Sequence, residues 1–176
     1  MKEHLDGFLR SCRSRLDDGL TAMWGPSATI PAGLNEPGRY ATSHGGKQVR
    51  PTLYFAAYRA VAEADGSGAL PALALELIHT YSLIHDDLPA MDDDDMRRGK
   101  PSLHKAFDEA TAILVGDGLQ ARAFELIADA PELSAEQKVR MIKVLAQASG
   151  FEGMVGGQYV DIQAVDSDMS LEELKA

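Results

Sequence analysis

Apolar residues recur at helical spacing along most of the chain. In the clearest case, five positions follow one helix face in the i, i+3, i+4, i+7 pattern: Ala74, Leu77, Ile78, Tyr81 and Ile84. They predict a helix over residues 71–87, and further helices are predicted over residues 2–23, 51–64, 106–129, 134–149 and 151–165. Alternating runs of Val, Ile and Thr, which favour strands, are nearly absent. We therefore predict an all-α fold.

Proline and glycine residues mark the expected breaks between these helices. Residues 24–39 hold three prolines and several glycines, which predicts a loop or a broken connection. Residues 65–68, Asp-Gly-Ser-Gly, predict a turn. Pro89 disfavours helical backbone at Leu88, so the helix before it should end at Asp86 and Asp87.

Two capping boxes indicate where helices begin near the C-terminus. The first, residues 134–137, begins one of the predicted helices. The second, residues 170–173, lies just before the last residue, Ala176, so we expect the chain to be the front part of a longer protein. No internal repeat or linker is visible, and we interpret residues 1–176 as part of a single domain.

Composition and charge restrict the classes of function. The chain has 176 residues, of which 45% are hydrophobic, enough for one domain with a core. Its formal net charge of −10 argues against nucleic acid as a partner. Cys12 is the only cysteine, which excludes an internal disulfide and a cysteine-based zinc site. No apolar run approaches the roughly 18 residues of a membrane span, and the N-terminus lacks the apolar core of a signal peptide, so we expect a cytoplasmic protein.

Six aspartates crowd into the ten residues 86–95, and Arg97, Arg98 and Lys100 follow them. Carboxylates this close repel one another unless a cation lies among them, and the negative end of a helix dipole adds to the repulsion. Mg2+ prefers oxygen ligands and shares its shell with substrate phosphates, while arginine binds phosphate oxygens in pairs. The segment predicts a site for a metal–diphosphate complex; the alternative is a solvated acidic loop. An EF-hand is excluded, because neither register supplies its glycine and glutamate.

A second candidate cluster, residues 45–51, reads Gly-Gly-Lys-Gln-Val-Arg-Pro. Its glycines let a ligand approach the backbone, and Lys47 and Arg50 can face one phosphate at a helix N-terminus. The cluster does not match the nucleotide P-loop.

His79 lies two helical turns before Asp86 on roughly the same face, so it is a candidate for ligand binding. The alternative is a purely structural histidine. We interpret His85 and His104 as structural.

A pair of glycines precedes Gln158 within a predicted helix. Glycines at such positions permit either close helix packing or the close approach of a ligand. Gln158 and Asp161 share one face, and Gln158 is a further candidate for substrate binding.

Four segments together resemble the trans-prenyltransferases, and most of all the bacterial-type farnesyl diphosphate synthases. They are residues 47–51 (KQVRP), His79, residues 86–101 (DDLPAMDDDDMRRGKP) and residues 153–158 (GMVGGQ). The aspartate–arginine segment is highly specific, and the resemblance covers nearly the whole chain from about residue 39 onward. It implies a fold of the isoprenoid-synthase type, a helical bundle around a central apolar cavity, with the C-terminal helices missing from this chain.

The resemblance also implies roles for individual residues. Mg2+ would be held by Asp86 and Asp92, with Asp87 completing the motif, and Arg97 would grip the allylic diphosphate. The isopentenyl diphosphate site would be formed by Gly46, Lys47, Arg50, His79 and Arg98. The implied protein is a homodimer that condenses isopentenyl diphosphate with dimethylallyl or geranyl diphosphate to farnesyl diphosphate, by Mg2+-assisted ionisation of the allylic diphosphate.

Product length is a further expectation. In the family, the residue five positions before the first aspartate helps to form the floor of the cavity. Here it is Tyr81, about 7.5 Å along the helix from Asp86. A bulky ring at this position predicts a fifteen-carbon product. The alternatives are an ordinary core role for Tyr81 and the synthesis of geranylgeranyl diphosphate.

The chain departs from the family pattern in one respect. No second DDxxD motif occurs, and residues 161–168 do not supply one. We therefore expect the chain alone to be inactive or nearly so, with half of the metal site, and to expose apolar surface. Two other classes of function are a non-catalytic subunit of a prenyltransferase complex and a plain divalent-cation-binding protein. The intact aspartates and arginines argue against the former, and Lys47, Arg50 and Arg98 would have no purpose in the latter.

Overall fold

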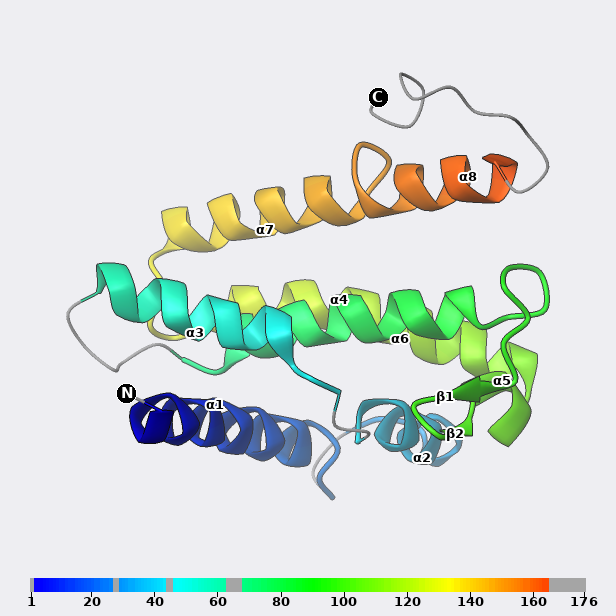
Figure 1. The fold of residues 1–176 in the computed structure, drawn as a ribbon, viewed down its shortest axis with the longest axis horizontal. Helices are drawn as coiled ribbons and strands as arrows, with labels where there is room; N and C mark the ends of the chain where they lie inside the picture. The colour runs from blue at the N-terminus through cyan, green and yellow to red at the C-terminus, as the bar shows by residue number, and fades with distance from the viewer. Residues whose placement is uncertain (1, 27–28, 44–45, 63–67, 165–176) are drawn as a thin grey trace. The chain divides into compact units, whose positions relative to one another are not determined.

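The computed structural model describes residues 2–26, 29–43, 46–62 and 68–164 (Figure 1). The chain falls into two compact units, residues 1–134 and residues 135–176. The capping box at residues 170–173 and most of the turn predicted at residues 65–68 lie outside the described residues.

The first unit is built from helices and one small hairpin. Its elements are α1 (Lys2–Met23), α2 (Ala32–Thr42), α3 (Val49–Val61), α4 (Leu70–Asp86), β1 (Met96–Arg97), β2 (Lys100–Pro101), α5 (Leu103–Ala106) and α6 (Glu109–Asp129). The second unit contains α7 (Ala135–Ser149) and α8 (Met154–Ala164). The predicted all-α class is confirmed, with the hairpin as an addition.

Helix α4 is the centre of the first unit. It packs most extensively against α6 and also against α3 and α1, and Figure 1 shows it alongside α3 and α6. All five apolar positions that predicted this helix are buried, with at most 7% of any residue exposed. Burial of a large apolar side chain contributes about 1.5–3 kcal/mol, so the position of α4 is well fixed. As Pro89 predicted, the helix ends at Asp86.

Residues 32–42 form a helix where a loop was expected, and that prediction was wrong. Pro37 lies inside α2 and removes one backbone hydrogen bond from it. Packing on Trp24 outweighs this loss. A Cβ built on Gly38 would come within 2.1 Å of the indole ring, and the indole Nε1 donates to Thr42 Oγ1 at 2.8 Å. The helix therefore depends on a contact that the local sequence does not contain.

The hairpin β1–β2 directly follows the aspartate run, and the hydrophobic pattern did not predict it. Arg98 and Gly99 join the strands with positive φ angles of 52° and 80°, as a type I′ turn requires. The Tyr40 hydroxyl of α2 donates to the Pro101 carbonyl at 2.8 Å. The hairpin is thereby held against α2.

Two helix boundaries differ from the predicted ones. The helix predicted over residues 106–129 begins three residues later, as α6 at Glu109, and the separate short helix α5 precedes it, with an irregular backbone at Phe107 between the two. Asp108 then caps α6, since its carboxylate accepts from the Thr111 N–H at 2.8 Å. Helix α3 begins at Val49, two residues before the predicted start.

In the second unit, α7 begins directly after Ser134, as the capping box predicted. Helix α8 begins at Met154, three residues later than expected, because residues 150–153 form a turn in which the Gly153 N–H donates to the Gly150 carbonyl at 3.0 Å. None of the helices in the described part of the chain combines the length and apolarity that a membrane span requires.

Candidate active site

The aspartate loop begins where α4 ends, with Asp86 as the last helical residue and Asp87 as its cap. The loop then turns back, because the Asp92 N–H donates to the Asp86 carbonyl at 2.9 Å and the Asp93 N–H donates to the Leu88 carbonyl at 3.2 Å. Asp93 takes a positive φ of 51°, which aspartate tolerates better than most residues. These bonds return Asp92 to Asp86, the two residues predicted to hold the metal.

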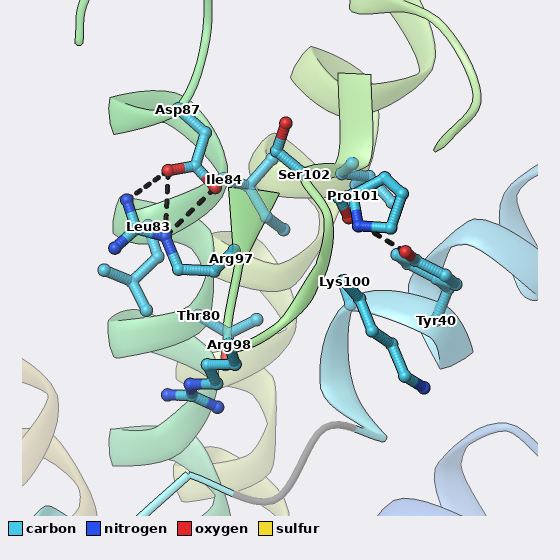
Figure 2. Close-up of a pocket in the computed structure, with 12 residues that line it drawn as sticks. Tyr40, Thr80, Leu83, Ile84, Asp87, Arg97, Arg98, Lys100, Pro101 and Ser102 are labelled. Atoms are coloured by element: carbon cyan, nitrogen blue, oxygen red, sulfur yellow. Dashed lines mark hydrogen bonds and ion pairs between the residues drawn. The ribbon is translucent and has the colours of Figure 1, made fainter. Parts of the chain in front are cut away.

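Arg97 neutralises two of the six aspartates. Its Nε donates to the two oxygens of Asp87 at 2.9 and 3.2 Å, and its Nη2 donates to Asp87 and, at 3.1 Å, to Asp94. Figure 2 shows the Asp87 pair at the end of α4. Asp87 is only 2% exposed, and a carboxylate this buried requires such a partner. The hydrogen bond with Asp87 raises the pKa of the Arg97 guanidinium. Arg97 therefore holds the loop in shape.

Lys105 neutralises two more aspartates. Its ammonium lies 2.8 Å from Asp95 Oδ1 and 4.0 Å from Asp93 Oδ1, and its hydrogen bond lowers the pKa of Asp95. The buried His104 adjoins the same carboxylates, and one ligand atom from each of these three side chains lies within 4.8 Å of the others. Lys105 already supplies a positive charge to Asp93 and Asp95. We therefore interpret Asp93, Asp95, His104 and Lys105 as a structural cluster that holds the loop, and not as a metal site.

Asp86 and Asp92 are the remaining two aspartates. Among the described residues, no lysine or arginine lies within ion-pair distance of either carboxylate. Burial raises the pKa of Asp86, and the charges of Asp92 and Asp87 raise it further. A divalent cation between the carboxylates would relieve this repulsion, and carboxylate oxygens are the ligands that Mg2+ prefers. The donor set therefore fits the predicted metal.

A second candidate site is a cavity of about 560 Å3, which is lined by Arg98 of the hairpin turn but by none of the six aspartates. It brings together all five residues predicted to form a second diphosphate site, and its lining consists of Arg13, Gly46, Lys47, Gln48, Val49, Arg50, Glu76, His79 and Arg98. Figure 2 shows Arg97 and Arg98 pointing in opposite directions along α4. The hairpin thus directs one arginine to the aspartate loop and the next into the cavity.

Gly46 lies directly against the guanidinium of Arg98. A Cβ built on Gly46 would come within 2.5 Å of Arg98 Cζ, so any side chain there would displace the guanidinium. Glycine at this position therefore permits the close contact that seats Arg98 in the cavity.

The cavity is strongly electropositive. It contains Arg13, Lys47, Arg50 and Arg98 against one carboxylate, Glu76, which is 8% exposed. Burial raises the pKa of Glu76, against the opposing charges of Arg98 and Arg50. An excess of cations around a space of this size suits a multiply charged anion.

His79 is neutral at pH 7 in this setting. Burial is the main cause that lowers its pKa to about 4, and the charges of Arg50, Arg98 and Arg97 act in the same direction. A neutral imidazole has one N–H to donate, so His79 can contribute a hydrogen bond to an anion without adding charge.

Sequence reasoning missed two residues of this cavity. Arg13 reaches it from α1, and only the packing of α1 against α3 and α4 brings it there. Glu76 did have a signal, because it precedes His79 by three residues and shares its helix face in an otherwise apolar run.

A much smaller cavity, of about 50 Å3, lies between α2, α4 and the hairpin, and it is the one drawn in Figure 2. Thr80 and Ile84 line it from α4, and Pro101 and Leu103 line it from the chain after the turn. Its volume suffices for one or two water molecules, so we assign it no substrate.

Two other candidate residues lie apart from these groups. Tyr81 is 4% exposed, its hydroxyl has no hydrogen-bond partner in the described part of the chain, and its ring packs edge to face on His85 with centroids 5.8 Å apart. Gln158 lies on α8 in the second unit, and its role in substrate binding stays a prediction.

The chain is similar to proteins of known sequence and structure. A family profile for polyprenyl synthetases matches residues 31–176. The chain is 43% identical to farnesyl diphosphate synthase of Bacillus subtilis (strain 168), over 100% of this chain and 60% of that protein. It is 47% identical to a chloroplastic geranylgeranyl pyrophosphate synthase of Catharanthus roseus, over 99% of this chain and 48% of that protein.

Among solved structures, a geranyltransferase from Legionella pneumophila matches with a TM-score of 0.87 and 46% identity. The match covers 98% of this chain and 60% of that one, and it confirms the predicted fold class. The chain thus spans about half to 60% of the length of the relatives that it matches.

Proposed function

Because the chain belongs to the polyprenyl synthetase family, we propose that its complete gene product condenses isopentenyl diphosphate with dimethylallyl or geranyl diphosphate to give farnesyl diphosphate. One arrangement carries this proposal. Asp86 ends α4, the following loop brings Asp92 back to it, and the hairpin after this loop also borders a cavity rich in cations. A metal-bound diphosphate suits the carboxylates, and a metal-free diphosphate suits the cavity.

Asp86 and Asp92 would hold Mg2+, and Asp87 would support them from its ion pair with Arg97. When bound, Mg2+ would supply the positive charge that neutralises the leaving diphosphate. The Asp92–Asp86 backbone bond holds the two residues together before any ligand binds, and the charge of Asp92 acts on the Asp86 carboxyl, so the chain itself brings the donors near one another.

The cavity would bind isopentenyl diphosphate. Lys47, Arg50 and Arg98 supply the charge for the diphosphate, and neutral His79 supplies one N–H. In the reaction, the allylic carbon–oxygen bond breaks, the double bond of isopentenyl diphosphate attacks the allylic carbon, and a proton leaves the product. No side-chain nucleophile is needed, so the work of these residues is positioning and charge stabilisation.

Tyr81 is proposed to limit the product to fifteen carbons. Its ring is buried one and a half turns before Asp86, and its bulk would close the space below the aspartates. Geranylgeranyl diphosphate synthesis is a second candidate function, favoured by the 47% identity to the Catharanthus roseus enzyme. The length of the product separates the two.

We also propose that the protein is a homodimer. Ile113 and Leu114 are exposed on α6, although large apolar side chains of this kind are more commonly covered. Analytical ultracentrifugation of the complete gene product should give the mass of two chains, and a monomer at micromolar concentration would contradict the proposal.

The function is tested by incubating the complete gene product, and separately this 176-residue chain, with Mg2+, isopentenyl diphosphate and geranyl diphosphate. Chromatography should reveal farnesyl diphosphate from the complete product and little or none from the chain alone. Removal of Mg2+ with EDTA is the control and should abolish product. A complete gene product that binds both diphosphates but forms no longer prenyl chain would contradict the proposed function.

A further inference from the structure

The imidazole of His85 occupies the place where a side chain at Gly116 would begin. A Cβ built on Gly116 of α6 would lie 2.1 Å from Nε2 and 2.6 Å from Cδ2 of His85. Glycine destabilises a helix interior relative to alanine, so its presence there calls for a reason. Gly118 lies two residues further along the same helix, and a Cβ built on it meets nothing within 4 Å. The close contact with His85 is therefore specific to Gly116.

The ring is also held at its edges. His85 Nε2 lies 3.3 Å from the Ile113 carbonyl oxygen, so the tautomer with the proton on Nε2 donates a hydrogen bond to α6. Asp117 Oδ1 lies 3.9 Å from the same nitrogen, and the Tyr81 ring packs against the imidazole from one turn earlier on α4. The contacts with Ile113 and Asp117 fasten the last turn of α4 to α6, while Tyr81 supports the ring from within α4.

The contacts of His85 lie directly beside the residues proposed to bind the metal. His85 directly precedes Asp86, and the Asp86 carbonyl accepts the bond that brings Asp92 back to it. Any displacement of the last turn of α4 therefore moves both carboxylates. We propose that His85, seated on Gly116, is a positioning residue that sets the Asp86–Asp92 pair for its divalent cation. This inference rests on the metal-binding role proposed above for the two aspartates.

The test measures binding of Mn2+ to the complete gene product, from the electron paramagnetic resonance signal of the free ion, without any catalytic turnover. Gly116→Ala would expel the imidazole and should raise the Kd for Mn2+ about 10-fold or more, in the range seen when groups supporting metal ligands are removed. Gly118→Ala is the matched control, because its methyl group enters open space, and its Kd should stay within about twofold of wild type.

A positioning role is separated from simple packing by two variants at His85. His85→Gln places an amide nitrogen near the position of Nε2, so it should retain most of the Mn2+ affinity. The double variant His85→Ala/Gly116→Ala removes both the clash and the anchor. Its melting temperature should recover relative to Gly116→Ala alone, while its Mn2+ affinity stays weak.

Two results would overturn this inference while leaving the proposed function in place. One is equal Mn2+ affinity in Gly116→Ala and Gly118→Ala. The other is full recovery of affinity in the double variant, which would show that only the clash matters. A wild-type protein that binds no Mn2+ would instead contradict the proposed function and this inference with it.

Discussion

Protonation of His79 links the electrostatics of the cavity to the stability of the fold. Burial, together with the charges of Arg50, Arg98 and Arg97, lowers the pKa of His79 from its ordinary 6.5 to about 4. Below pH 6.5 the unfolded chain takes up a proton at this residue, whereas the folded chain takes it up only near pH 4. The free energy of unfolding is therefore unaffected by His79 above pH 6.5, and it decreases as the pH falls from 6.5 toward 4, because only the unfolded chain is protonated at His79 in that range.

The size of this effect follows from the pKa difference. At about 1.36 kcal/mol per unit, the full shift from 6.5 to about 4 corresponds to about 3.4 kcal/mol. About 2 kcal/mol of this falls between pH 7 and pH 5. Because His79 keeps some exposure to solvent, these values are upper limits. His79→Gln removes the titrating group and should remove this part of the pH dependence.

Urea unfolding, followed by circular dichroism at pH 7 and pH 5, measures the difference. Wild type should lose up to about 2 kcal/mol more free energy of unfolding than His79→Gln between these pH values. The acidic groups with raised pKa values, Glu76 and Asp86, contribute with the opposite sign but are common to both proteins. His4→Gln, at an exposed position of α1, is the control and should follow wild type. Equal losses in wild type and His79→Gln would refute the electrostatic reasoning.

Three further substitutions test separate parts of the site. Asp92→Asn should weaken Mn2+ binding at least about 10-fold, whereas Asp93→Asn, at a carboxylate that lies near Lys105, should change it little; equal effects would contradict the division between them. Arg13→Gln should raise the KM for isopentenyl diphosphate about 5- to 10-fold and leave the KM for geranyl diphosphate unchanged. Its control is Arg10→Gln, one turn away on α1, which should leave both KM values unchanged. Tyr81→Ala should lengthen the product on chromatography, and an unchanged product would exclude the length-limiting role.

Local pattern predicted the helices whose stability is local in origin. Helix α4 was placed to within one residue at each end, because its apolar spacing, Pro71 and Pro89 all agree. Helix α2 was missed because its prolines argue against it, while the contact that supports it comes from Trp24. The hairpin was missed because strands of two residues show no alternation. The sequence signal for its turn was Gly99 alone, and the structure shows that Arg98 and Gly99 both take positive φ angles.

The site was predictable in its composition but not in its internal pairing. The sequence showed six acidic residues and the basic residues that follow them, and the family resemblance singled out Asp86 and Asp92, yet residue types alone did not show which basic residue pairs with which of the other aspartates. Their roles diverge in space, because Asp92 bonds back to Asp86 while the loop brings Asp95 to Lys105. Such pairings depend on backbone geometry over ten or more residues, which residue types alone do not define.

Arg97 must satisfy two demands if the proposed function holds. Its Nε–H and both N–H groups of Nη2 are directed at Asp87 and Asp94, and no acceptor for Nη1 is present among the described residues. Taking the partner from a buried carboxylate costs about 3–5 kcal/mol, so a diphosphate gains little by drawing Arg97 away from Asp87. The guanidinium has five donors in a fixed plane, so it can keep Asp87 and still offer Nη1 to a phosphate. A lysine has a single ammonium and cannot reach both groups in this geometry. If Arg97 binds a diphosphate as the proposed function requires, the need to hold a buried carboxylate at the same time would explain why an arginine follows the aspartate run.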